Sequence, residues 1–195
     1  MAYALEPLHR RQELIDDTIK LLKEEWPDCL AERLGLVETA QCTGLPCSLV
    51  LTESREGAIE DVLGHVRILG VHPETEQRVY LESVVIKKSR RKEGLGRKLH
   101  EMVEGYAKDS LGARYVHVNV MTEDNERFYR RLQYDSYPTF APQIAPNMLR
   151  TFDKARWDGI IIPDKWKHLY DDGEYLTAEE EAKLWYRALV KVLDG

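Results

Sequence analysis

The chain has 195 residues, of which 43% are hydrophobic and 32% charged, and its formal net charge is −6. This length fits one domain with a buried core, and the excess of acids argues against a nucleic-acid partner, because neutralising phosphates needs a basic face. The sequence contains no run of about 18 apolar residues that could span a bilayer and no secretory signal pattern at its start. We therefore expect a cytoplasmic protein, with the nucleus as the alternative, and no membrane partner.

The three cysteines are Cys29, Cys42 and Cys47. An odd number cannot all pair, and none has zinc-ligand spacing with the histidines. We therefore expect reduced, structural cysteines and no metal site.

The first part of the chain predicts helices followed by an antiparallel meander. A short extended entry at 5–8 leads into a helix over 12–26 with one apolar face, which Pro27 ends. A second short helix is expected over 30–36. Three apolar segments between polar turns then read as strands. These segments are residues 46–52, 61–69 and 79–86.

A strand–helix–strand unit follows the meander. A helix with a 3.6-residue apolar period begins near Gly94, and Gly112 is placed to cap its carboxyl end. Residues 114–121 alternate as a strand, and a unit of this length implies a parallel pair joined by a right-handed crossover. The predicted fold is therefore α/β, with a mixed, mostly antiparallel sheet and helices on both of its faces.

The remainder predicts a helix over 123–132, a strand over 134–140 and a last helix over 178–193. The last helix has a capping-box pattern at Thr177-x-x-Glu180. We expect one domain over residues 1–145, with residues 146–195 as an extension that packs on it.

The junction between the 79–86 strand and the next helix is suited to binding an anion. The first N–H groups of a helix lack intrahelical partners, and the helix dipole adds partial positive charge there. Gly94 and Gly96 allow a phosphate to approach the backbone, and a basic run, 87–92, precedes them.

Read as Arg91-x-x-Gly94-x-Gly96, this junction resembles the pyrophosphate loop of the Gcn5-related N-acetyltransferases, which bind acetyl-CoA. The hexapeptide alone is as typical of a helix that starts after a basic surface turn. The order of elements over residues 1 to about 140 is also that of the family. Asn125 to Tyr134, which contains Phe128-Tyr129, resembles a second family segment, although Gln133 stands where glycine is usual.

The resemblance implies acetyl-CoA as cosubstrate, held where the two parallel strands splay. The backbone of Val84, Val85 and Ile86 would pair with the pantetheine arm. The predicted pyrophosphate-binding residues are Arg91, Lys92, Glu93, Gly94, Leu95, Gly96 and Arg97. Asn125 would meet the cofactor from the following helix.

The resemblance also implies a general acid and leaves two candidates for the base. Tyr129 would protonate the departing thiolate; the alternative is an aromatic core residue. Glu82 or His117 would take the proton of the amine, directly or through water. Glu82 could instead be a strand carboxylate paired with Arg67 or Arg78, and His117 a buried sheet histidine.

Within the family, the amino-terminal block from Leu5 to Leu34, together with Gly64-His-x-Arg67, resembles the enzymes that acetylate the amino terminus of actin. This implies an acidic protein amino terminus as partner, with Arg33 and Arg67 as candidate substrate-binding residues; the alternative is that both are ordinary surface cations. Two other functions stay open: acetylation of a small amine, and a non-catalytic acetyl-CoA-binding module.

Overall fold

The computed structural model describes residues 2–27, 45–55, 58–70, 77–120, 122–136 and 187–193. The chain divides into two compact units, one of Met1–Val116 with Val192–Gly195 and the other of His117–Lys191. The expected division after residue 145 lies outside the described residues, as does the helix expected over 30–36.

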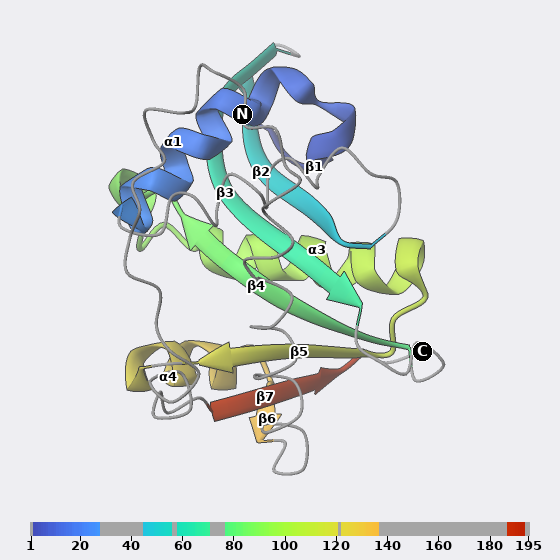
Figure 1. Ribbon diagram of the computed structural model, residues 1–195. Helices are drawn as coiled ribbons and strands as arrows, with labels where there is room; N and C mark the ends of the chain where they lie inside the picture. Colours follow the sequence, from blue (N-terminus) through green and yellow to red (C-terminus); the bar gives the residue numbers. More distant parts are fainter. Residues whose placement is uncertain are drawn as a thin grey trace, which may run out of the picture. The chain divides into compact units, whose positions relative to one another are not determined.

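Four antiparallel strands form the sheet of the first unit, in the order β1-β2-β3-β4 (Figure 1). They are β1 (Ala2–Pro7), β2 (Cys47–Arg55), β3 (Ala58–Gly70) and β4 (Arg78–Ile86). The last three are the predicted meander. The expected extended entry at 5–8 turns out to belong to a full edge strand, which pairs with β2 from Ala2 opposite Ser54 to Pro7 opposite Leu49. Pro7 is tolerated because an edge strand needs ladder partners on one side only.

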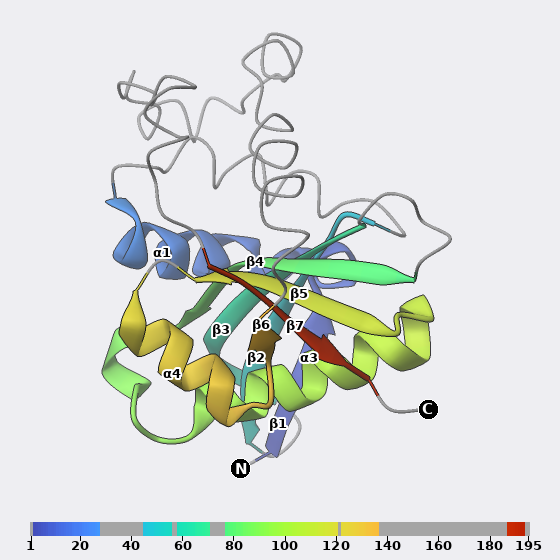
Figure 2. The same ribbon diagram turned by 90° about the horizontal axis from the view of Figure 1, so that it is seen from below.

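Helices α1 (Ile15–Glu25) and α3 (Leu95–Leu111) cover opposite faces of this sheet, as Figures 1 and 2 show. Each presents an apolar stripe to the sheet. In α3 the stripe consists of buried residues four apart, namely Leu95, Leu99, Val103 and Ala107. The chain reaches α1 through two short 3₁₀ turns, η1 (Leu8–Arg10) and η2 (Gln12–Leu14), so the helix predicted from residue 12 begins with a tighter turn.

Strand β5 (Tyr115–Val120) begins beside the start of β4. The backbone N–H groups of Arg114 and Tyr115 donate to the carbonyl of Gln77, over 2.8 and 3.3 Å. The Arg78 guanidinium carbon lies 4.4 Å from the centroid of the Tyr115 ring. The two strands therefore start together and form the predicted parallel pair, with α3 as the crossover. Gly112, at φ 65°, caps α3 as predicted.

The second unit contains the rest of β5, helix α4 (Glu123–Arg131), and the antiparallel strands β6 (Asp135–Ser136) and β7 (Arg187–Val192), in the strand order β5-β7-β6. Thr122 caps α4 by accepting the backbone N–H of Asn125 over 3.2 Å. Acids occupy the first turn of α4 and arginines its last, as the helix dipole favours.

The helix expected over 178–193 is wrong where the structure describes it. Residues 187–192 form β7, in which Val190 pairs with Asp135 and Leu189 with Ser136. Leu189 and Val190 are both buried. A short apolar run with β-branched residues fits a buried strand as well as a helix, and here pairing with a distant strand determines the outcome. The strand expected over 134–140 is described only at 135–136, and the remainder of both segments lies outside the described residues.

The chain thus has an α/β fold whose strands are mostly antiparallel, with one parallel pair and helices on both faces, as the sequence predicts. Among the described residues, no helix is long and apolar enough to cross a membrane. Cys47 is a free, buried cysteine, and burial raises the pKa of its thiol to about 11, so the thiol is protonated at neutral pH. Cys29 and Cys42 lie outside the described residues.

Candidate active site

Strand β4 contains a bulge immediately before the residues expected to bind the pantetheine arm. His65 pairs with Val85 and Arg67 with Glu82, so the single residue Val66 lies opposite two residues of β4, Ser83 and Val84. Ser83 has a left-handed backbone, with φ 51°. A bulge leaves its extra residue out of the ladder and re-aims the strand. The backbone of β4 therefore leaves the regular ladder with β3 immediately before Val84.

His65 fixes the bulge from the interior. Its ring is fully buried, and its Nδ1 lies 3.0 Å from the carbonyl oxygen of Ser83. Because a carbonyl oxygen can only accept, Nδ1 must carry the proton in this contact. The orientation of the peptide between Ser83 and Val84 is therefore set by a buried hydrogen bond from β3.

The loop between β4 and α3 leads into a helix start that no side chain caps. Lys92 and Gly94 are both left-handed, with φ 70° and 81°. No side chain caps α3, whose first turn therefore keeps its free N–H groups. A Cβ at Gly94 would meet no atom within 4 Å, so space is open beside these groups among the described residues. The residues present thus fit an anionic group at this helix start.

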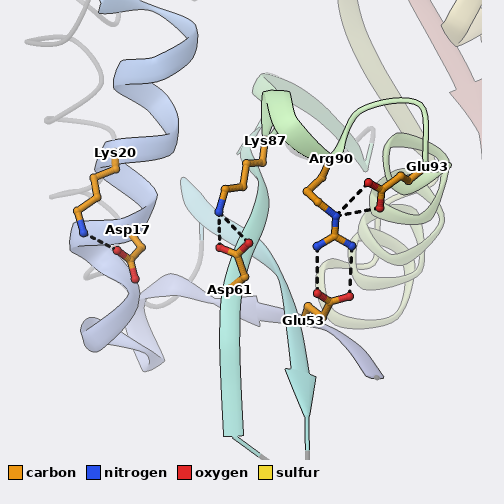
Figure 3. Close-up of polar contacts among 7 residues, drawn as sticks. All are labelled: Asp17, Lys20, Glu53, Asp61, Lys87, Arg90 and Glu93. Atoms are coloured by element: carbon orange, nitrogen blue, oxygen red, sulfur yellow. Dashed lines mark hydrogen bonds and ion pairs between the residues drawn. The ribbon is translucent and has the colours of Figure 1, made fainter.

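Most of the basic side chains of residues 87–92, in the first part of this loop, form ion pairs with acids or hydrogen bonds to backbone carbonyls. Lys87 pairs with Asp61 at 2.6 Å (Figure 3), and Lys88 donates to the carbonyl of Glu24 at 2.6 Å. Arg91 donates to Glu25 at 2.6 Å and to the carbonyl of Ile86 at 3.0 Å. These cations anchor the loop to α1, β3 and β4.

Three cations are placed differently. Lys92 and Arg97 are exposed on the loop and the first turn of α3, and Lys98 Nζ lies 5.3 Å from the centroid of the Tyr3 ring. Within the described part of the chain, no ion pair is found for these three residues. Lys92 and Arg97, which are exposed, are therefore the side chains best placed to add positive charge for a phosphate.

Glu82 and Arg67, predicted for different roles, form one ion pair. They are register partners on β4 and β3, and Arg67 Nη1 donates to Glu82 Oε1 over 2.6 Å. The side chains are only 9% and 12% exposed, Arg67 being the more buried. Removing either partner would leave a charge without its counterion in a mostly dry position. Arg33, the other predicted substrate-binding residue, lies outside the described residues.

The second unit holds the remaining predicted site residues. His117 is buried on β5, and the side chain of Asn125 is exposed in the first turn of α4. Tyr129 is buried near the end of α4, with its ring centroid 5.3 Å from those of Phe128 and Tyr134 in edge-to-face contacts. Burial raises the pKa of Tyr129, so its phenol keeps its proton at neutral pH.

Gln133 adopts the backbone of the glycine that it replaces in the family pattern, with φ 69°. We expect Gln133→Gly to stabilise the fold by about 0.5–1 kcal/mol, because the left-handed conformation costs an L-residue about 1–2 kcal/mol and glycine returns part of this as chain entropy. Urea unfolding would measure the change. Gln12→Gly, in a 3₁₀ turn with ordinary φ, is the control and should destabilise. An equal loss of unfolding free energy in Gln133→Gly and Gln12→Gly would show that the backbone at Gln133 is not strained.

The sequence missed the bulge at Ser83 and an acid, Glu53, which it assigned to a polar turn. Glu53 lies on β2, where its carboxylate accepts from Arg90 Nη1 over 3.0 Å. Neither feature has a local signal in the sequence, because a bulge depends on strand register and the ion pair joins residues 37 positions apart.

The family model for the acetyltransferase (GNAT) family matches residues 10–134, and the chain belongs to that family. Proteins of the family use acetyl-CoA, in agreement with the cosubstrate that the sequence predicts.

Among curated proteins, the chain is similar to N-alpha-acetyltransferase 80 of Mus musculus, with 33% identity over 125 residues. The match covers 64% of this chain and 38% of the mouse protein, so the matched region spans well under half the length of that relative.

Solved structures show the same fold at low identity. An aminoglycoside 6'-acetyltransferase type Ii has a TM-score of 0.58 at 15% identity, with 98% of this chain and 97% of that chain covered. An aminoglycoside 6'-N-acetyltransferase complexed with coenzyme A has a TM-score of 0.57 at 15% identity, with 97% and 96% covered. A spermidine N-acetyltransferase SpeG chimera from Vibrio cholerae and hSSAT reaches 0.59 at 12% identity, with 98% and 96% covered.

Proposed function

We propose that the chain is an N-alpha-acetyltransferase that transfers the acetyl group of acetyl-CoA to the free amino terminus of an acidic protein, with actin as the substrate. The observation that carries this proposal is the 33% identity to a protein amino-terminal acetyltransferase over 125 residues. The cytoplasm is the compartment that we propose for this activity.

The loop supports the cosubstrate part of the proposal. Exposed N–H groups at the start of α3, open space at Gly94 and the cations Lys92 and Arg97 suit a pyrophosphate. The side chain of Arg91 is held by Glu25 and Ile86, so its proposed contribution is through backbone and loop shape. The bulge at Ser83 supports pantetheine binding along Val84 to Ile86.

Acetyl transfer forms a bond between the amine nitrogen and the carbonyl carbon and breaks the bond from that carbon to sulfur. The amine loses a proton, and the thiolate that leaves takes one up. Tyr129, which keeps its phenolic proton, suits the role of acid. An α-amino group has a pKa near 7.7–8.0, so a weak base is sufficient. Glu82, ion-paired with Arg67, or His117 would accept the proton directly or through water.

A panel of acceptors tests the substrate. We expect peptides that begin Asp-Asp or Glu-Glu to have a kcat/KM at least tenfold above peptides with basic amino termini, measured by thiol release. The preference should shrink at high salt, where screening weakens a local attraction between charges. Peptides with neutral amino termini are the control and should show little salt dependence.

Other results of the panel would point to other functions. Faster acetylation of spermidine than of any acidic peptide would contradict the actin proposal and favour a small-amine acetyltransferase. Acetyl-CoA binding without turnover of any acceptor would indicate a binding module.

A further inference from the structure

Arg90 lies at the end of the 3₁₀ turn η6 (Lys88–Arg90) and is held by two carboxylates (Figure 3). It directly precedes residues 91–97, the segment proposed to bind the pyrophosphate of acetyl-CoA and called the acetyl-CoA loop below. Its two Nη atoms donate to the two oxygens of Glu53, over 3.0 and 3.4 Å. Its Nε donates to both oxygens of Glu93, over 2.9 and 3.1 Å. One guanidinium therefore links strand β2 to a residue inside the loop.

Glu53 is built into the sheet and is not a mobile surface acid. Its side chain is 7% exposed, and its register partner is Tyr3 on the edge strand β1. The hydrogen bond that Arg90 donates lowers the pKa of Glu53, and one from the Tyr3 hydroxyl makes a smaller contribution in the same direction. The carboxylate is therefore charged at neutral pH and has a fixed position.

The same sheet edge also contacts the other end of the loop. Lys98, in the first turn of α3, places its ammonium group over the ring of Tyr3. Arg90, before the loop, is thus attached to Glu53, and Lys98, after it, to Tyr3, the register partner of Glu53. The loop is clamped at its two ends on neighbouring residues of β1 and β2.

The backbone of the loop needs such a clamp. Lys92 is left-handed, which costs an L-residue about 1–2 kcal/mol, and glycine at 94 adds chain entropy that must be lost when the loop is ordered. Contacts elsewhere must hold this conformation. Paired guanidinium and carboxylate groups do so with defined geometry, because the bidentate fork fixes orientation as well as distance.

We propose that Glu53 and Arg90 are positioning residues that hold the loop in its acetyl-CoA-binding shape, and that Arg90 is not a phosphate ligand. The proposal rests on the role of the loop in acetyl-CoA binding. Arg90 donates to carboxylates from Nε and both Nη atoms, and the group of Arg90, Glu53 and Glu93 carries one net negative charge. Such a group would not attract a pyrophosphate by its charge.

Glu53→Gln separates the two roles by the sign of its effect. If Arg90 bound phosphate, removing a competing carboxylate would free it and tighten acetyl-CoA binding. If Glu53 and Arg90 hold the loop, the variant should raise the acetyl-CoA dissociation constant about fivefold or more, measured by calorimetry. Asp109→Asn makes the same change in charge on α3, about 20 Å from the start of that helix. This control should leave the acetyl-CoA affinity within twofold of the wild type.

Steady-state kinetics provide a readout that a general loss of structure would not give. We expect Glu53→Gln to raise the KM for acetyl-CoA while leaving the KM for the acceptor and the saturated kcat near wild type. Arg90→Lys keeps the charge but loses the bidentate fork, so it should weaken acetyl-CoA binding in the same way. Unchanged affinity in folded Arg90→Lys would contradict the proposal.

Two further results separate the failure of this proposal from the failure of the function. If the wild-type protein does not bind acetyl-CoA, the role of the loop itself is wrong. If the wild type binds and folded Glu53→Gln binds equally or more tightly, only the positioning role is wrong. Should Glu53→Gln not fold, Glu93→Gln is the deciding variant. The Glu93 side chain is 44% exposed, so this change should not disturb folding, and it removes the second carboxylate that holds Arg90. Unchanged acetyl-CoA affinity in Glu93→Gln would overturn the proposal.

Discussion

Tyr129→Phe is expected to lower kcat by about a hundredfold or more, while the acetyl-CoA dissociation constant stays within about twofold. A general acid acts in the transition state, and positioned proton transfer typically contributes at least ~10²-fold. The change removes one oxygen and keeps the ring that packs against Phe128 and Tyr134. Single-turnover rates at saturating acetyl-CoA, together with calorimetric affinities, would measure both quantities.

Tyr115→Phe is the matched control for this experiment. It removes a hydroxyl from the start of β5, where the ring stacks under Arg78, and it should not change kcat. The alternative for Tyr129 is a core aromatic residue. Lower thermal stability and weaker binding in Tyr129→Phe, without a selective fall in kcat, would show that this alternative is correct.

The helices were predictable because their signals are local. Apolar residues four apart in α3 and the glycines at its two ends lie within one stretch of sequence, and acids before arginines in α4 do so as well. The strand β7 was not predictable in this way. Its Leu189 satisfies a helical period too, and only the pairing of Leu189 with Ser136 and of Val190 with Asp135, more than fifty residues earlier, makes a strand.

In the candidate site, too, the features with local sequence signals were predictable and those that depend on distant residues were not. Its backbone component, a glycine loop after a strand and before a helix, is visible in the sequence, and Gly94 has a left-handed backbone that glycine adopts without strain. For the side-chain pairs, the sequence offers Arg67 or Arg78 as an alternative partner of Glu82, but it cannot decide between these two arginines or between pairing and catalysis. The position of Glu82 opposite Arg67 depends on the bulge at Ser83, which shifts the register of β4 against β3. Two residues that the sequence assigns to separate roles therefore form one buried pair.

Gly96→Asp should raise the acetyl-CoA dissociation constant at least tenfold, which corresponds to about 1.4 kcal/mol. Gly96 is the second residue of α3, next to the free N–H groups of its first turn. A carboxylate there would occupy the region of positive potential and repel a pyrophosphate. Calorimetry with acetyl-CoA would measure the change in affinity.

Gly96→Asp should lower the affinity for acetyl-CoA without lowering the stability of the fold, so a loss of binding could not be attributed to unfolding. An acid in the first turn of a helix interacts favourably with its dipole, and replacing glycine removes chain entropy from the unfolded state. The melting temperature of Gly96→Asp should therefore equal or exceed that of the wild type. Gly105→Asp introduces the same side chain in the middle of α3, where a Cβ would meet no atom within 4 Å, and should leave acetyl-CoA affinity unchanged. Equal affinities in folded Gly96→Asp and Gly105→Asp would mean that acetyl-CoA does not bind at the start of α3.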